Sequence, residues 1–197
     1  MLFRSKAAAR TGVKQATTLQ KPGKKVAGRA PARAGARSTI RAAPTRRRQL
    51  VIDATNVICG AQNTSRLDLL LSLVVAAAKK GRDVLCIFDA STPHRLETSP
   101  ERDLYRWLLQ DKEDHFIQCP GRTQADALIL AEAERMRCQV VSNDFFRDRE
   151  ERFPWVRDKD RVLRHQPIRD VLYVDDVAVP IETDLRALKR QIDRLIA

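Results

Sequence analysis

From Gln49 onward, short apolar runs of strand length alternate with stretches whose apolar residues recur at helical spacing. The strand-like runs cover residues 50–53, 83–88, 115–119 and 138–142, and helical patterns lie between them at 67–80, from 99 onward and at 123–136. Such alternation is typical of a parallel sheet with helices on both faces. The sequence therefore predicts an α/β fold in three layers, with a central, mostly parallel sheet flanked by helices.

Local signals set the expected helix boundaries and the C-terminal part. Ser99, followed by Pro100 and Glu101, is expected to cap one helix, and Thr123 is expected to cap the next. With Asp126 three residues later, Thr123 resembles the start of a capping box, which is the alternative to a metal-ligand role for Asp126. After Asp144 the alternation weakens. Residues 171–174 and 177–181 are expected to pair as short strands, and 185–196 to form an amphipathic helix.

The positive charge of the chain is concentrated at its N-terminus. The net charge is +12, yet residues 1–48 hold 14 of the 37 Lys and Arg residues and no acid, which leaves 23 basic and 25 acidic residues in 49–197. We expect a basic, disordered tail over 1–48 and a folded domain over 49–197. Three roles are open for the tail: an arm that binds RNA phosphates, an organelle targeting peptide or a solubilising linker.

The cysteine and histidine content argues against a zinc site and for a reducing compartment. The four cysteines are widely spaced with no C-x-x-C pair, and only three histidines are present. Cys86 and Cys138 lie in apolar runs and are expected to be buried free thiols. We find no apolar run of transmembrane length. An intracellular location, in a bacterial cytoplasm or a mitochondrial matrix, is expected, and homodimer formation is left open.

Acidic residues follow the predicted strands or begin a predicted helix. They are Asp53, Asp89, Asp126 and Asp144. Each alone has an ordinary explanation, such as a turn, a cap or a charge that complements a helix dipole. In α/β folds, however, ligands bind at the carboxyl edge of the sheet, where such residues converge. Clustered carboxylates require a neutralising cation, so the sequence predicts a site for Mg²⁺ or Mn²⁺ that serves phosphodiester chemistry.

Three segments resemble the NYN domain, a ribonuclease domain of PIN-like (Rossmannoid) fold. They are residues 51–56, 123–130 and 140–148, of which the string V-V-S-N-D-F-F-R-D is the most specific. The similarity extends over about 49–181 and is strongest to the branch that contains the animal CCCH zinc-finger endoribonuclease regnase, although this chain has no zinc finger. The resemblance implies cleavage of single-stranded or loop RNA with Mg²⁺ or Mn²⁺.

The resemblance also assigns roles to residues. It implies that Asp53, Asp126 and Asp144 are catalytic metal ligands and that Asn56 is the asparagine of the motif. Asp148, Asp89, Ser142 and Asn143 are expected to support them. Capture of RNA would fall to arginines, namely Arg46, Arg47 and Arg48 of the tail and Arg95, Arg122, Arg147 and Arg149 of the domain.

Two positions depart from the family pattern. Ala54 stands where relatives have glycine after the first acid, and Ala125 stands where relatives have a second acid beside Asp126. The second departure removes one carboxylate, for which we expect Asp89 to compensate. Three functions are therefore considered: a metal-dependent endoribonuclease, a non-catalytic RNA-binding or ribonucleoprotein component with a degenerate site, and a toxin-like or DNA-directed nuclease of the same fold.

Overall fold

The computed structural model of the chain describes residues 49–60 and 65–196. The predicted tail over 1–48, with Arg46, Arg47 and Arg48, lies outside the described residues.

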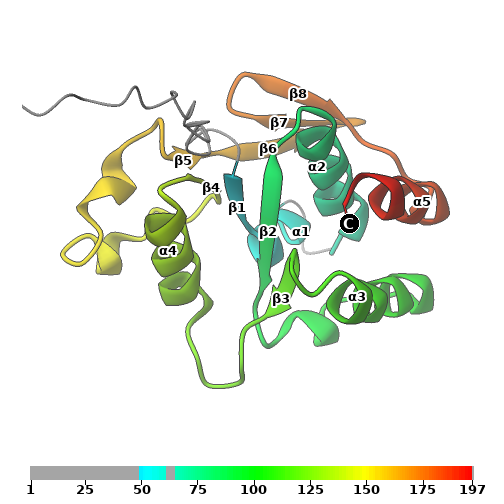
Figure 1. Cartoon of the computed structure of the whole chain (residues 1–197), viewed down its shortest axis with the longest axis horizontal. Helices are drawn as coiled ribbons and strands as arrows, with labels where there is room; N and C mark the ends of the chain where they lie inside the picture. Colours follow the sequence, from blue (N-terminus) through cyan, green and yellow to red (C-terminus); the bar gives the residue numbers. More distant parts are fainter. Residues whose placement is uncertain (1–48, 61–64, 197) are drawn as a thin grey trace, which may run out of the picture. The chain divides into compact units, whose positions relative to one another are not determined.

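A five-stranded parallel sheet forms the centre of the domain (Figure 1). Its strands are β1 (Gln49–Asp53), β2 (Asp83–Phe88), β3 (Phe116–Gln118), β4 (Gln139–Val141) and β5 (Val162–Leu163). They lie in the order β3-β2-β1-β4-β5, and every neighbouring pair is parallel. The order runs outward from β1 in both directions, so β1 lies at the point where ligands bind in open α/β sheets.

Helices cover both faces of this sheet (Figure 1). They are α1 (Ala54–Ile58), α2 (Leu67–Lys79), α3 (Ser99–Asp111), α4 (Ala125–Met136) and α5 (Leu185–Leu195). Side chains of β1 alternate between the faces, because successive residues of a strand point to opposite sides. Leu50 and Ile52 belong to the apolar core shared with α1, α2, α3 and α5, whereas Val51 belongs to a second core with α4. The predicted three-layer α/β fold is confirmed.

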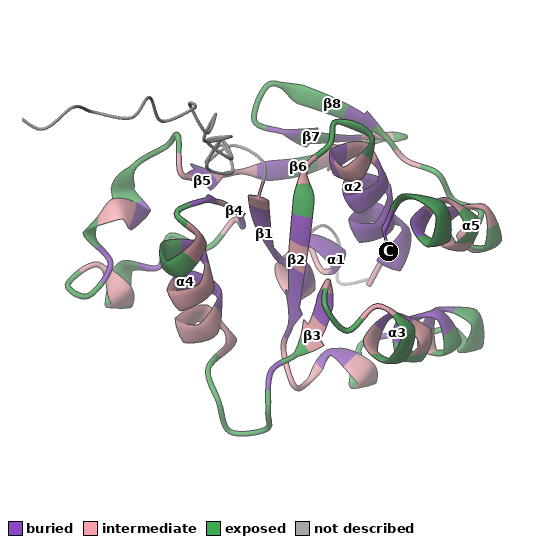
Figure 2. Ribbon diagram, in the orientation of Figure 1, coloured by how far each residue is buried: buried purple, intermediate pink, exposed green. Residues whose placement is uncertain are grey.

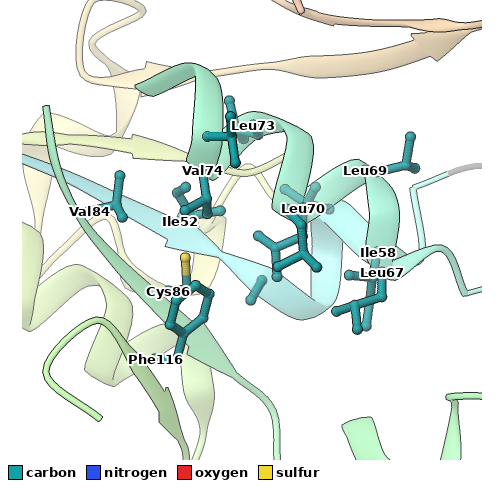
Figure 3. Packing of buried hydrophobic residues seen from close by; sticks show 14 of the residues in the cluster. Ile52, Ile58, Leu67, Leu69, Leu70, Leu73, Val74, Val84, Cys86 and Phe116 are labelled. Atoms are coloured by element: carbon teal, nitrogen blue, oxygen red, sulfur yellow. The ribbon is translucent and has the colours of Figure 1, made fainter. Parts of the chain in front are cut away.

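The first of these cores is dominated by α2, which is buried along most of its length (Figure 2). Its Leu70 and Val74 lie against Ile52 of β1 and the Cys86 thiol of β2 (Figure 3). A run of leucines and valines with so few polar residues folds as a helix here because it is enclosed between the sheet and other elements. The predicted helix is therefore confirmed, and it is buried on more than the one face that its apolar spacing indicated.

A second, antiparallel sheet follows β5. It contains β6 (His165–Ile168), β7 (Val171–Val174) and β8 (Val177–Pro180) in that order. The predicted pairing of the two short strands around Asp175 and Asp176 is confirmed by the β7–β8 ladder. Leu172, Val174 and Val179 join the first core, so this sheet is packed against the domain rather than added to its surface.

Local details differ from the sequence predictions at both predicted helix starts. The cap of α3 is Thr98, whose hydroxyl accepts a hydrogen bond from the Glu101 amide while the Glu101 side chain accepts one from the Thr98 amide. Ser99 is therefore the first helical residue. At α4 the cap position is Gln124, and no side chain caps the helix, so the predicted Thr123 cap is wrong and the alternative capping-box interpretation of Asp126 is excluded. Helix α1 and strands β5 and β6 were not predicted.

All four cysteines of the chain are free. Cys86 and Cys138 are buried free thiols as predicted, Cys119 is also buried, and Cys59 is partly buried. Within residues 49–60 and 65–196, no helix combines the length and the apolar character needed to cross a membrane.

Candidate active site

Asp53 is the last residue of β1 and the cap of α1, which places its carboxylate at the carboxyl edge of the sheet. Its Oδ1 accepts a hydrogen bond from the Asn56 amide at 3.1 Å, and its Oδ2 accepts one from the Ser142 hydroxyl at 2.8 Å. Only 7% of the residue is exposed. Burial raises the pKa of Asp53 from 3.8 to about 6, although both hydrogen bonds lower it, and the charges of Asp126 and Asp144 raise it further.

Ser142, the residue after β4, links two of the predicted acids. Its buried hydroxyl donates to Asp53 and accepts a hydrogen bond from the Asp144 amide at 3.1 Å. Asp144 is exposed, and its Oδ1 accepts from the Phe146 amide at 2.8 Å. One hydroxyl thus contacts both Asp53 and the backbone of Asp144. The supporting role expected for Ser142 stays a prediction.

Asp126 lies in the first turn of α4, partly buried. Burial raises its pKa, and so do the negative charges of Asp144, Asp148 and Asp89, whereas Arg149 opposes the shift. Asp89 follows β2, where its amide donates to the Thr55 hydroxyl. Asp148 lies in the 3-10 helix η2 (Arg147–Arg149) and pairs with Arg149 at 3.1 Å.

The five aspartates therefore share one electrostatic field. Asp53 is affected by Asp126 and Asp144, and Asp126 is in turn affected by Asp89, Asp144 and Asp148. The carboxyl ends of β1 and β2 and the beginning of α4 lie on the same side of the sheet (Figure 1). The structure thus brings the predicted acids to one edge, with few cations to offset their charge.

The donor set matches a hard divalent cation, since all of the candidate ligands are carboxylate or hydroxyl oxygens. Within the described ranges, however, no three side chains of His, Cys, Asp or Glu stand together as a ready-made metal site. Mg²⁺ usually keeps several water ligands and needs only one or two carboxylates. The residues fit an ion that is held mainly through water.

Asn56 and Asn143 lie in a second network, beside the acids. The Asn56 Oδ1 accepts from the Asn143 amide at 2.9 Å and lies 2.8 Å from His165 Nε2. Asn143 completes the link through its side chain, which accepts from the His165 amide and donates to the His165 carbonyl. The side-chain oxygen of Asn56 is therefore occupied by contacts that tie α1 to the end of β4 and to β6.

His165 is a site residue that the sequence analysis did not find. It is 4% exposed, and burial followed by the charge of Arg164 lowers its pKa from 6.5 to about 4, so the ring is neutral. A Cβ on Gly60 would lie 2.7 Å from the ring, which explains a glycine at that position. No sequence signal links His165 to Asn56, because 109 residues separate them.

The sequence of this chain matches the model of one known protein family. Residues 46–179 match the family described as the Zc3h12a-like ribonuclease NYN domain. This match covers more than half of the chain. The chain belongs to this NYN domain family. The match ends within β8, so α5 lies beyond it. No curated protein sequence matches the chain.

Solved structures show the same fold. The NYN domain is similar to nuclear proteinaceous RNase P 2 (PRORP2) from A. thaliana, with a TM-score of 0.53 and 18% identity over 68% of this chain and 30% of that chain. A second structure of A. thaliana PRORP2 gives a TM-score of 0.52 and 18% identity, over 70% of this chain and 31% of that one. The chain thus spans about 30% of the length of PRORP2. At this identity the likeness establishes the fold, and the predicted PIN-like architecture is confirmed.

The arginines predicted for RNA binding occupy different places in the NYN domain. Arg147 and Arg149 belong to η2, near Asp148. Arg122 is exposed in the loop before α4, where its φ is 66°. Arg95 is exposed and contacts the Ser91 hydroxyl at 3.4 Å. Arg164 was not predicted, although its Nη1 donates to the carbonyls of Ser142 and Asp144 at 3.0 and 2.7 Å.

Proposed function

We propose that this chain is a metal-dependent endoribonuclease that hydrolyses phosphodiester bonds of RNA. The proposal is carried by one observation: Asp53, Asp126 and Asp144 come from three separate parts of the chain to the carboxyl edge of the sheet, where the charges of Asp126 and Asp144 raise the pKa of Asp53. Membership of a ribonuclease NYN domain family supports RNA as the substrate class. We infer single-stranded or loop regions as the sites of cleavage.

The residues of the chain have distinct roles in this proposal. Asp53 is preorganised, because Ser142 and the Asn56 amide each satisfy one of its oxygens and leave the remaining lone pairs free. Ser142 is a positioning residue, since it also orients the backbone of Asp144. Asp144 is exposed and stands where the substrate can reach it. Asp126 contributes its charge from the start of α4.

A divalent ion, Mg²⁺ or Mn²⁺, would be held by Asp53, Asp126 and Asp144 with water molecules. When bound, it would lower the pKa of a water molecule and offset charge on the leaving oxygen. The raised pKa values of Asp53 and Asp126 support this assignment, since a cation would favour their ionised forms. Asp89 is the candidate to replace the acid that relatives carry at Ala125.

The test is cleavage of a labelled single-stranded RNA with Mn²⁺, with Mg²⁺ and with excess EDTA. We expect cleavage that depends on the metal and falls by at least about a hundredfold in Asp144→Asn, since the change removes a charge that acts on the reacting centre. Asp103→Asn is the matched control, because Asp103 is an exposed acid on α3 that pairs only with Arg106 in the described chain. Robust cleavage in EDTA would contradict the metal mechanism.

A second candidate is a non-catalytic RNA-binding or ribonucleoprotein component, which binds RNA without turnover. Ala125 in place of an acid and the lack of a three-acid group among the described residues favour it. Tight RNA binding with no cleavage, unaffected by Asp53→Asn, would support this alternative. Substituting single-stranded DNA of the same sequence distinguishes a ribonuclease from a DNA-directed nuclease.

A further inference from the structure

Phe145 is an exposed aromatic residue directly after the candidate metal ligand Asp144. It is 60% exposed, while the adjacent Phe146 is fully buried in the core beside α4. Phe146 adopts a left-handed backbone conformation with φ 49°, and its amide donates to the Asp144 carboxylate. Burial of Phe146 therefore fixes the turn that carries Asp144 and directs the ring of Phe145 outward.

Two arginines lie over the Phe145 ring, and they differ in how firmly they are held. The guanidinium of Arg164 is 4.3 Å from the ring centroid and is fixed by its hydrogen bonds to the carbonyls of Ser142 and Asp144. The guanidinium of Arg147 is 5.2 Å from the centroid and makes no hydrogen bond or ion pair with another residue of the described ranges. One cation thus orients the ring, and the other can move to meet a phosphate.

The ring forms part of the wall of an open groove of about 660 Å³. Val156 and Val162 give this groove an apolar surface, and its remaining lining is charged. The cations of the lining are Arg147, Arg157, Lys159 and Arg164, and the acids are Glu150, Asp158, Asp160, Asp175 and Asp176. Acids outnumber cations, so the groove is poorly suited to a run of phosphates. Carboxylates do accept hydrogen bonds from the amino groups of nucleobases.

We propose that this groove binds an unpaired nucleobase of RNA, stacked on Phe145, next to the reacting phosphodiester. The inference rests on the proposed function, because it places the base beside Asp144. Aromatic side chains stack on bases of single strands regardless of sequence, whereas bases in a duplex have both faces covered. Carboxylates along the groove favour bases with amino groups, and Arg147 contacts the phosphate that flanks the stacked base.

Binding is tested with the full chain and a short single-stranded RNA that contains 2-aminopurine, whose fluorescence falls when it stacks. EDTA keeps the RNA intact, so binding is separated from cleavage. We expect Phe145→Ala and Phe145→Leu to weaken binding about tenfold and to remove the fluorescence decrease, since one base stack is lost. Phe145→Trp should retain both. Tyr173→Ala is the control, as Tyr173 is an exposed aromatic on β7 outside the groove lining.

The kinetic arm uses Mn²⁺ and the same RNA. Phe145→Ala should raise KM about tenfold and leave kcat within about threefold, because the ring binds the substrate and does not act on the phosphate. The duplex form of the RNA should show no fluorescence decrease. If the wild type cleaves the RNA and Phe145→Ala has the same KM and the same fluorescence decrease, the base-binding groove is overturned and the proposed function stands. Binding and stacking without cleavage by the wild type would instead overturn the proposed function and leave the groove standing.

Discussion

Asp53 shows how a single residue can limit the stability of the domain. Its pKa is raised to about 6, since burial outweighs its hydrogen bonds to Ser142 and Asn56. A group with a raised pKa in the folded state costs stability once it ionises, and an unfolded Asp ionises already near pH 4. This loss of stability is absent at low pH, grows as the pH rises from about 4 to about 6, and is complete above about pH 6.

We therefore expect Asp53→Asn to be more stable than the wild type by about 2 kcal/mol in EDTA at pH 7.5. Asparagine keeps an oxygen that can cap α1 but carries no charge. Urea denaturation at pH 7.5 and pH 4.5 measures the change, and the advantage should shrink at the lower pH. Asp103→Asn is the control for removal of an exposed acid. A less stable Asp53→Asn at pH 7.5 would show that the charge stabilises the fold.

The buried ring of His165 gives a pH dependence of the opposite sign. Its pKa is lowered to about 4, so between pH 6.5 and 4 the unfolded chain takes up a proton that the folded protein does not bind. Between pH 7.5 and pH 5, the free energy of unfolding of the wild type should fall by about 2 kcal/mol more than that of His165→Gln. Glutamine is the suitable variant because its amide can replace Nε2 as the donor to Asn56. Urea denaturation of both proteins at the two pH values measures this. If their free energies of unfolding differ by the same amount at pH 7.5 and at pH 5, the prediction is wrong.

At the scale of the elements, the N-cap of α3 differs between prediction and structure: Ser99 was predicted, and the structure has Thr98. Thr98→Ala removes the hydroxyl that caps the helix, and a lost N-cap costs about 1 kcal/mol. Ser99→Ala should change stability by less than about 0.5 kcal/mol, since Ser99 is exposed and its hydroxyl contacts only Arg102 in the described chain. Thermal or urea denaturation of the two variants makes the comparison. Equal losses would mean that Ser99 shares the capping role.

The elements that could be predicted are those with a long, regular pattern. The strand around Ile52, the leucine-rich helix and the hairpin around Asp175 were all recognisable from periodicity and turn residues. Helix α1 has five residues and β5 has two, which is too short for a pattern to emerge. Thr98 and Ser99 are both good capping residues, so only the backbone geometry distinguishes them.

The candidate site was predictable to the extent that acids follow strands. Asp53 and Asp144 lie at strand ends that a parallel sheet must bring to one edge, and Asp126 begins a helix on that side. The residues that were missed, His165 and Arg164, act through partners 20 or more residues away and belong to segments without a motif. Their contribution depends on tertiary packing, which no local pattern encodes.

The whole domain extends beyond the segment matched by its family. Leu188 of α5 is fully buried in the first core, where α5 packs on α2, although the family match ends at residue 179. Leu188→Ala should therefore lower the free energy of unfolding by about 2–4 kcal/mol, because it leaves a cavity. Leu195→Ala is the control, because Leu195 is 40% exposed on the same helix. Denaturant midpoints measure both, and a loss below about 1 kcal/mol for Leu188→Ala would show that α5 is dispensable.

The distribution of charge over the whole chain predicts how RNA binding responds to salt. Residues 1–48 carry 14 cations, while residues 49–197 have two more acids than bases. If the N-terminal segment contacts phosphates, its removal should lower RNA affinity and flatten the dependence of affinity on salt, because fewer counterions are released. Fluorescence anisotropy over a series of salt concentrations measures this. An unchanged salt slope would favour the targeting-peptide interpretation instead.

The order of the strands also determines when the acids can come together as the chain is made. β1 is synthesised early, yet its partner β4 begins at Gln139, and Asp53 is held by the hydroxyl of Ser142, 89 residues later. The Asn56 network is completed only by His165. A ribosome adds about 5–20 residues per second, so several seconds pass before the cluster can form. The proposed nuclease centre is therefore absent during most of the synthesis of the domain, while the chain is still attached to the messenger RNA that encodes it.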